Sequence, residues 1–220
     1  LNLSLGGGGA CDATTQNAIN GARARGAVVV VAAGNDAVNV SNASPANCSG
    51  VIAVAATGRS GGRASYSNYG TLVDVAARRG DGANGVLSTL NTGTGAPASD
   101  SYAAYQGTSM AAPHVAGVAA LMLALNTNLT PDEIESRLKS TARAFPASCS
   151  GCGSGIVDAA AAVAAATAPV AQPVTLAESE SNNTIATADP VSASNTTVSG
   201  NMGSTSDSDY FRVDLPEIGR

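Results

Sequence analysis

The sequence predicts an α/β protein in which helices cover both faces of a mostly parallel sheet. Two runs of apolar residues, 27–31 and 51–55, lack the alternation of polar and apolar side chains that marks a half-buried strand. Continuous apolar strands are typical of parallel sheets that are buried on both faces. A helical pattern over 12–26 separates the first run from an apolar segment at 1–5. This strand–helix–strand order indicates parallel pairing, so we expect a three-layer, doubly wound sheet.

The first expected helix follows the apolar segment 1–5. Asp12 or Thr14 can cap its N-terminus, and Gly26 can end it in the left-handed conformation that glycine tolerates. Its apolar stripe consists of Ala18, Ile19 and Ala22. That spacing places the stripe on one face of the helix, where it can pack on the sheet.

Further strands are expected after this unit. Besides 51–55, short apolar segments occur at 73–76 and 86–90, and loops rich in Gly, Ser and Asn separate them. A long apolar helix should follow, from about residue 107 to Leu125.

Two more helices are expected before residue 168. Thr130 and Glu133 have the spacing of a capping box, and Pro131 lies between them at the first helical position. An Ala-rich helix over about 155–168 should close the domain, and a flexible linker is the alternative, which Val157 and Val163 disfavour. These helices would form an outer scaffold.

Composition favours a globular protein that binds neither nucleic acid nor membranes. The chain has 220 residues, of which 44% are hydrophobic, enough for a sizeable core. Its 16 acidic and 11 basic residues give a net charge of −5, without a basic patch to follow a phosphate backbone. No apolar run is expected to reach the roughly 20 residues that span a bilayer, because Pro113, His114 and Gly117 interrupt the longest one.

The cysteines indicate disulfides and an extracellular setting. They are Cys11, Cys48, Cys149 and Cys152, an even number without a second pair of zinc-type ligands. Cys149 and Cys152 have the CxxC spacing of redox and metal motifs, but they lie in a Ser/Gly loop, which favours a structural clip. Cys11 would then pair with Cys48.

A reactive serine is predicted at position 109. Residues 107–117 read GTSMAAPHVAG, a glycine turn that leads into a helix of small residues. Ser109 would occupy the first helical position, where free N–H groups and the positive end of the helix dipole favour a developing oxyanion. The alternative is a serine that only caps a core helix, which is the commoner role of an isolated serine.

This run resembles the serine motif of subtilisin-like (S8 family) peptidases. The resemblance extends to Ser4–Gly7, which read SLGG, and to Ala32–Asn35, which read AAGN, within residues 1–168. It implies the C-terminal part of a subtilisin-like catalytic domain from a secreted bacterial serine endopeptidase, acting through a Ser109 acyl-enzyme. In that family a propeptide inhibitor and the catalytic Asp and His precede the first strand, so we expect the domain to be incomplete at its N-terminus.

The second oxyanion donor is expected at Asn35. It follows a buried strand at the carboxyl edge of the sheet, and its amide would bind the oxyanion together with the Ser109 backbone N–H. The alternative is a plain turn at Asn35 and Asp36, since asparagine favours turns.

Substrate should bind as an extended peptide, and we expect protein or peptide substrates and a monomeric enzyme. Glycines expose the backbone of Ser4–Gly7, so a peptide strand can add alongside. The pocket beside Ala33 would admit an apolar P1 side chain, and specificity should be broad. A Gly-rich loop without a ligand is the alternative. The expected substrate-binding residues are Ser4, Leu5, Gly6, Gly7, Ala32, Ala33 and Gly34.

His114 is the one histidine of the chain, but it should not be the general base. Five helical residues advance by about 500°, so His114 would point some 140° away from Ser109. A hydrogen-bonded core histidine is the expected role, and the base must come from elsewhere. A peptide-binding remnant without activity is the alternative function. A serine esterase is disfavoured, because Gly107-x-Ser109-x-Ala111 is not the G-x-S-x-G elbow.

Composition changes after residue 168. Residues 169–177 form a proline-containing linker, and 178–220 are rich in Ser, Thr and Asn with short β-like alternations. The latter segment resembles the start of a bacterial pre-peptidase C-terminal domain, a small β-sandwich that is expected to be incomplete here.

No cofactor is expected for the chemistry, and a structural calcium ion has no assigned place. Asp207, Asp209 and Asp214 offer oxygen ligands, but solvated turn acids are the more common interpretation, because calcium takes about 6 to 8 oxygens. Relatives commonly carry a calcium-binding acid where this chain has Gly58. They also carry Pro-Gly where it has Arg78 and Arg79, so that loop should differ.

Overall fold

The structure is a computed structural model that describes two long ranges of the chain and several short segments. It describes residues 1–78 and 85–167, and beyond them 174–177, 184, 186, 188–191, 196–199 and 211–213. Contacts within the chain divide it into two compact units, Leu1–Ala168 and Pro169–Arg220.

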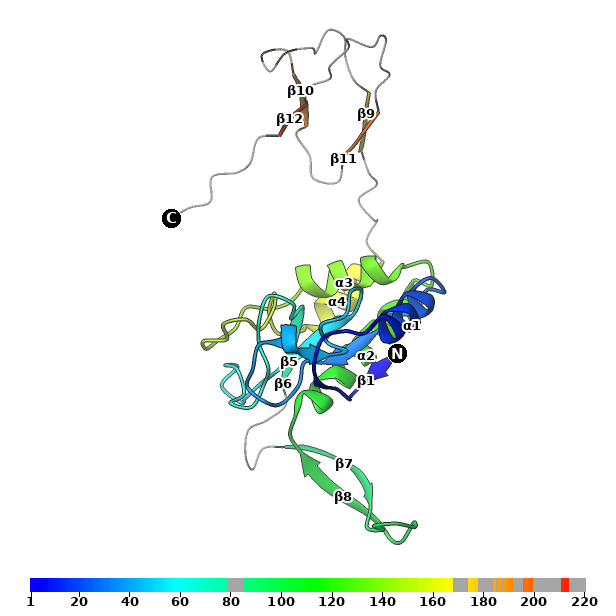
Figure 1. Ribbon diagram of the computed structural model, residues 1–220, viewed down its shortest axis with the longest axis vertical. Coiled ribbons are helices and arrows are strands. Elements are labelled where there is room, and N and C mark those ends of the chain that lie inside the picture. Colours follow the sequence, from blue (N-terminus) through cyan, green and yellow to red (C-terminus); the bar gives the residue numbers. More distant parts are fainter. Residues whose placement is uncertain are drawn as a thin grey trace. The chain divides into compact units, whose positions relative to one another are not determined.

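A four-stranded parallel sheet forms the centre of the first unit (Figure 1). Its strands, in spatial order, are β1 (Asn2–Leu3), β3 (Val30–Ala32), β5 (Ile52–Thr57) and β6 (Val75–Arg78). Every neighbouring pair is parallel, as the continuous apolar runs predict. The sheet has helices on both sides, so the α/β fold class is confirmed. The helices are α1 (Ala13–Arg23), α2 (Thr108–Leu125), α3 (Pro131–Ser140) and α4 (Ala159–Ala166).

Alternate side chains of each strand enter two separate cores. In β5, Ile52 and Val54 face the core that includes α2, α3 and α4. Ala53 and Ala55 face the opposite core, which includes Ile19 of α1. All six residues of β5 are buried, which explains why its sequence shows no polar alternation.

The expected helix starts are present. Asp12 caps α1 by accepting a hydrogen bond from the Thr15 N–H at 2.9 Å. Thr130 and Glu133 form the capping box of α3, in which each side chain accepts from the other residue's backbone N–H. These caps satisfy N–H groups that have no partner within the helix.

Helix α2 is more continuous than the sequence suggests. It runs through Pro113, His114 and Gly117, and its 18 residues have a mean hydropathy of 1.5. By length and composition alone α2 could cross a membrane, so the expectation of an interrupted run is wrong. Its buried residues, Val115 and Met122 among them, pack in the core beside β3 and β5, as in the central helix of a folded domain.

Residues 86–90 do form a strand, but it does not join the parallel sheet. β7 (Val86–Asn91) pairs antiparallel with β8 (Asp100–Tyr105), a strand that the sequence analysis missed. This hairpin projects from the body of the first unit (Figure 1). Most of its residues are exposed.

Two disulfides join the expected cysteine pairs. Cys11, just before α1, is bonded to Cys48, and the two Cα atoms lie 5.2 Å apart. Cys149 is bonded to Cys152, with the Cα atoms 5.6 Å apart. The CxxC segment is therefore a clip within one loop.

The second unit is described only through short strands. β9 (Val174–Ala177) pairs with β11 (Thr196–Ser199), and β10 (Asp189–Val191) pairs with β12 (Phe211–Val213). The three candidate calcium ligands, Asp207, Asp209 and Asp214, lie outside the described residues, as do residues 169–173 of the expected linker. The rest of that segment, 174–177, forms β9, so its prediction as linker is wrong.

Candidate active site

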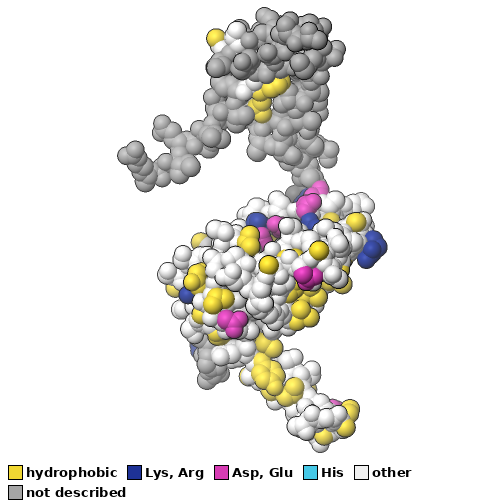
Figure 2. Space-filling model, in the orientation of Figure 1, with side chains coloured by type: hydrophobic (Ala, Val, Ile, Leu, Met, Phe, Trp, Pro, Cys, Tyr) yellow, Lys and Arg dark blue, Asp and Glu magenta, His cyan; other side chains and the backbone are white. Residues whose placement is uncertain are grey.

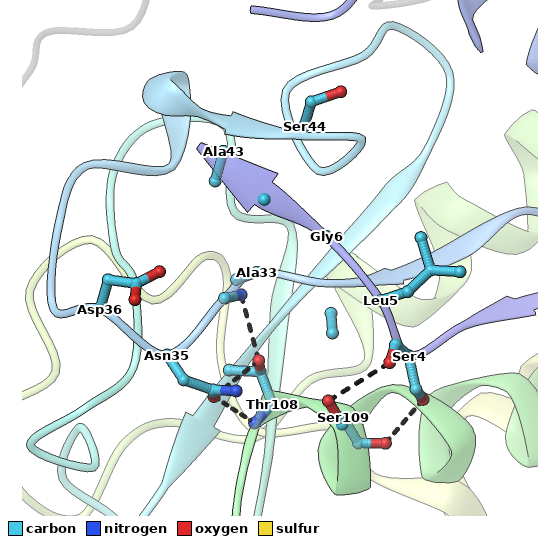
Figure 3. Close-up of a pocket in the computed structure, with 13 residues that line it drawn as sticks. Ser4, Leu5, Gly6, Ala33, Asn35, Asp36, Ala43, Ser44, Thr108 and Ser109 are labelled. Atoms are coloured by element: carbon cyan, nitrogen blue, oxygen red, sulfur yellow. Dashed lines mark hydrogen bonds between the residues drawn. The ribbon is translucent and has the colours of Figure 1, made fainter. Parts of the chain in front are cut away.

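A cleft of about 310 Å³ lies where the carboxyl ends of β1 and β3 meet the N-terminus of α2. Every predicted catalytic and substrate-binding residue lines it (Figure 3). These residues are Ser4, Leu5, Gly6, Gly7, Ala32, Ala33, Gly34, Asn35 and Ser109. Asp36, Ala43, Ser44 and Thr108 complete the lining. Three segments that lie far apart in the sequence therefore meet at one sheet edge.

Ser109 is placed by the first turn of α2. The helix starts at Thr108 rather than Ser109, so Ser109 is the second helical residue. Gly107, with φ at 147°, supplies the backbone conformation that turns the chain into the helix. Ser109 is half-buried at the cleft.

Ser4 and Ser109 hold the first strand against the helix. The Ser4 hydroxyl donates to the Ser109 carbonyl oxygen at 2.7 Å. The Ser109 hydroxyl in turn has a long contact of 3.5 Å with the Ser4 carbonyl oxygen. Because that contact is at the limit of hydrogen bonding, the Ser109 hydroxyl is held only weakly and can turn into the cleft.

Thr108 fixes the Asn35 side chain. Its backbone N–H and its hydroxyl both donate to the Asn35 Oδ1, at 2.9 and 3.0 Å. Thr108 Oγ1 also accepts from the Gly34 N–H at 3.1 Å. With Oδ1 occupied by two donors, the amide nitrogen is the end that faces Ser109 (Figure 3). The sequence analysis missed Thr108, although its position between Gly107 and Ser109 was a usable signal.

The segment expected to bind substrate has unpaired backbone groups. Leu5 and Gly6 make no backbone–backbone hydrogen bond with the described part of the chain. β2 (Gly7–Gly8) pairs with β4 (Ala43–Ser44) and anchors the end of the segment. The exposed backbone at Leu5 and Gly6 can accept an added peptide strand.

Among the described residues, no histidine lines the cleft, and Asp36 is the one ionisable side chain that does. The Ser109 hydroxyl contacts the Ser4 carbonyl oxygen and not Asp36. His114 lies further along α2, where its Nδ1 is 2.9 Å from the Met110 carbonyl oxygen. His114 is exposed, so the expectation of a core histidine is wrong. The geometric argument against its role as a base does not depend on that burial.

The described residues contain no group of three or more His, Cys, Asp or Glu side chains that could hold a metal ion. The cleft offers polar donors and a hydroxyl. Such a set can support nucleophilic attack and oxyanion binding.

The chain is similar to known proteases across its first unit. Residues 1–172 match the Peptidase S8 model, described as the subtilase family. An extracellular protease of Xanthomonas campestris is 62% identical over 168 residues, which are 76% of this chain and 28% of that protein. An extracellular basic protease of Dichelobacter nodosus is 45% identical over 168 residues, 74% of this chain and 27% of that protein. The chain thus spans less than a third of the length of either relative.

Solved structures agree with the sequence match. A protease of Pseudoalteromonas arctica superposes with a TM-score of 0.73 at 64% identity, over 76% of this chain and 50% of the other. A cold-adapted subtilisin-like serine proteinase gives a TM-score of 0.58 at 33% identity, over 70% of this chain and 53% of the other. On the evidence of sequence, fold and cleft together, the chain belongs to the subtilase family.

Proposed function

We propose that this chain supplies the nucleophile and the oxyanion hole of a secreted bacterial serine endopeptidase. The observation that carries the proposal is the network in which Thr108 joins the Asn35 amide to the first turn of α2, beside Ser109. Both relatives described above are named extracellular proteases, which supports secretion.

In the proposed reaction, Ser109 Oγ attacks the carbonyl carbon of a peptide bond. The resulting oxyanion accepts hydrogen bonds from the Ser109 backbone N–H and from Asn35 Nδ2. On collapse the C–N bond breaks, the base gives the proton taken from Ser109 to the leaving amine, and an acyl group remains on Ser109 until water hydrolyses it. The base that takes the Ser109 proton would come from catalytic Asp and His residues outside this sequence.

The substrate would lie extended along Leu5 and Gly6. Backbone hydrogen bonds there do not depend on side-chain identity, so specificity should be broad. Ala33 and Gly34 are small and leave room for an apolar P1 group. A propeptide inhibitor would occupy the same cleft in the precursor, and the mature enzyme would act as a monomer.

The remaining proposals concern the rest of the chain. A pre-peptidase C-terminal domain, expected at 178–220, would already begin with β9 at Val174–Ala177, and a shorter linker would join it to the catalytic domain 1–168. The chemistry needs no cofactor, and a structural calcium ion would be held elsewhere in the protein.

Two substitutions in the complete protease test the assignment. Ser109→Ala should abolish turnover and leave peptide affinity largely intact, because the hydroxyl acts in the chemical step. Asn35→Ala should lower kcat by about 10²- to 10³-fold with little change in KM. Steady-state kinetics on a peptide substrate measure both. If Asn35→Ala raises KM alone, Asn35 binds substrate and is not an oxyanion donor.

The alternative is a peptide-binding remnant without catalysis. Sequence upstream of Leu1 separates the two functions. An Asp block and a Gly-rich His block there would favour the enzyme. Their absence from the gene would favour the remnant.

A further inference from the structure

Asn68 is a buried polar side chain that the proposed chemistry does not use. It lies in the connection between β5 and β6, it is fully buried with 0% exposure, and it does not line the cleft. Burial of an amide costs free energy unless its donors and acceptors are paired, so its partners indicate what it holds in place.

Those partners all belong to the loop that carries Asn35. The Asn68 Nδ2 donates to the Ala33 carbonyl oxygen at 2.9 Å. Its Oδ1 accepts from the backbone N–H groups of Asp36 at 3.0 Å and Val38 at 3.1 Å. One side chain therefore ties the loop on both sides of Asn35.

The backbone of Asn68 and its neighbour adds further hydrogen bonds to the same loop, and we call the whole set the Asn68 clamp. Its N–H donates to the Gly34 carbonyl oxygen at 3.0 Å, and the next residue, Tyr69, donates to the Val38 carbonyl oxygen at 3.1 Å. Ser67 Oγ donates to the Asn68 carbonyl oxygen at 3.0 Å. The clamp is thus itself fixed to its surroundings.

Gly34 allows Asn68 to approach the loop so closely. Gly34 has φ at 107°, and a Cβ atom built there would lie 2.2 Å from the Asn68 Nδ2. The two residues therefore pack without free space, and the loop has no room to shift toward Asn68.

We propose that Asn68 is a positioning residue of the oxyanion hole, an inference that rests on the proposed function. Thr108 orients the Asn35 amide, and Asn68 fixes the backbone from which that amide projects. An oxyanion donor must be held to within about 0.5 Å, and a misplacement of about 1 Å can cost about 10²-fold in rate. Asn68 would then affect the chemical step, measured as kcat, through Asn35.

A double-mutant cycle in the complete protease tests this role. Asn68→Ala should lower kcat by about 10- to 100-fold and change KM by less than about threefold. In the Asn35→Ala background the same substitution should lower kcat by less than about threefold, because the donor that it positions is already absent. A matched control is Asn126→Ala. The Asn126 side chain donates one hydrogen bond and accepts one, but it lies at the C-terminal end of α2, away from the cleft. Its replacement should therefore leave kcat unchanged.

The outcomes separate the two claims. If Asn35→Ala lowers kcat and Asn68→Ala costs the same factor in both backgrounds, the positioning role is overturned and the oxyanion assignment stands. If Asn35→Ala leaves kcat unchanged, both claims fail. Should Asn68→Ala not fold, Asn68→Asp keeps the oxygen that accepts from Asp36 and Val38 and replaces the donor. It should also lower kcat only when Asn35 is present, and an equal loss in both backgrounds would again overturn the proposal.

Discussion

At the level of single residues, the surroundings of two glutamates of α3 shift their pKa values in opposite directions. Hydrogen bonds from the Thr130 N–H at 2.7 Å and hydroxyl at 3.0 Å lower the pKa of Glu133. Burial raises the pKa of Glu135, and the nearby charge of Asp74 raises it further. The ammonium group of Lys139, 3.3 Å from the Glu135 carboxylate, opposes this shift without cancelling it.

These shifts predict opposite pH dependences of stability. The pKa of Glu133 is lowered in the folded state. Its carboxylate therefore stabilises the fold at pH values above the usual glutamate pKa, and this stabilisation is lost as pH falls through the folded pKa. The raised pKa of Glu135 means that its contribution is present below the usual value and is lost as pH rises through the folded pKa. Relative to wild type, Glu133→Gln should therefore become less destabilising as pH falls, and Glu135→Gln less destabilising as pH rises.

Urea unfolding of the chain between about pH 3 and 7, followed by circular dichroism, measures both differences, since glutamate titrates near about 4.3 in unfolded chains. Each variant is the matched control for the other, because they lie two residues apart on one helix. If the difference in unfolding free energy from wild type changed with pH in the same direction for both variants, the assignment of opposite pKa shifts would be wrong.

Single residues also show what could be predicted from the sequence. Ser109 and Asn35 were predicted because each lies in a local run, GTSMAAPHVAG or AAGN, that resembles a motif of the subtilisin-like family. Thr108 and Asn68 act through partners that are 73 and up to 35 positions away along the chain. The position of Thr108 beside Ser109 was a local signal, but no local pattern indicates the partner of either residue, and a buried asparagine resembles a surface asparagine until the fold is known.

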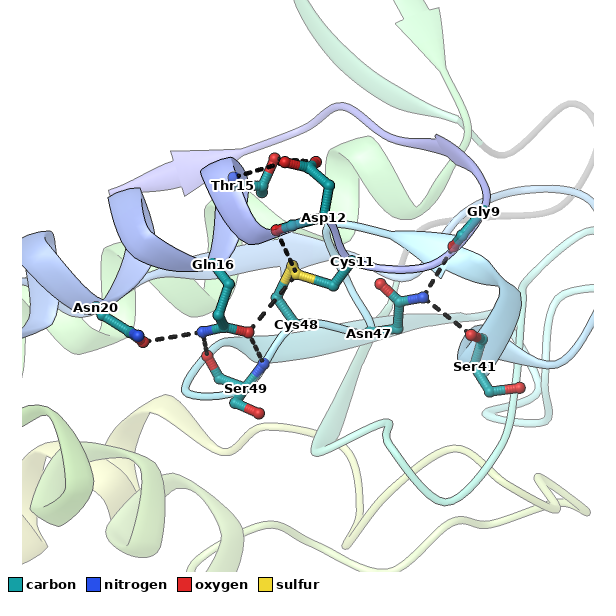
Figure 4. Close-up of a disulfide and its surroundings, with 10 residues drawn as sticks. All are labelled: Gly9, Cys11, Asp12, Thr15, Gln16, Asn20, Ser41, Asn47, Cys48 and Ser49. Carbon is teal, nitrogen blue, oxygen red and sulfur yellow. Dashed lines mark hydrogen bonds between the residues drawn. A yellow bond between two sulfur atoms is a disulfide. The ribbon is translucent and has the colours of Figure 1, made fainter.

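At the level of elements, the Cys11–Cys48 disulfide joins the two ends of the segment that contains α1 and β3 (Figure 4). Beside it, Gln16 of α1 bonds both backbone groups of Ser49, accepting at 2.8 Å and donating at 3.0 Å. Asn47 donates to the carbonyl oxygens of Gly9 and Ser41, each at 2.9 Å. The bridge therefore lies in a region that hydrogen bonds already tie together.

Loss of this bridge should cost more stability than loss of the CxxC clip. The two cysteines of the first bridge are 37 residues apart and those of the second are 3 apart. Chain-entropy estimates give about 4 kcal/mol for the longer loop and about 1.5 kcal/mol for the shorter. Thermal unfolding of two double variants, Cys11→Ser/Cys48→Ser and Cys149→Ser/Cys152→Ser, measures how far each lowers Tm relative to wild type. An equal loss of Tm would contradict the loop-length argument.

The hairpin shows the limit of element prediction. Residues 86–90 were predicted as a strand because they are apolar and partly β-branched, but their partner β8 begins with Asp100 and contains alanines at 103 and 104. Neither strand reveals its pairing direction. The parallel strands were easier, because burial on both faces leaves a continuous apolar run in the sequence.

At the level of the whole first unit, apolar side chains gather on the projecting hairpin (Figure 2). Leu87 and Tyr102 are 69% and 73% exposed. Leu121 and Leu125, on the outer side of α2, are also more than half exposed. Apolar surface of this kind commonly marks an interface or promotes aggregation.

The proposed position of the catalytic Asp and His outside this sequence predicts that residues 1–220 alone do not hydrolyse peptides at an enzymatic rate. A serine hydroxyl needs a base within about 2.6 to 3.2 Å to become a good nucleophile, and among the described residues that line the cleft Asp36 is the one ionisable side chain. The purified chain should react slowly with a fluorophosphonate probe. The complete protease should be labelled rapidly, and Ser109→Ala should abolish that labelling. If the 220-residue chain alone labels rapidly and cleaves casein in a Ser109-dependent manner, a residue within it supplies the base, and the division of the catalytic residues proposed above is wrong.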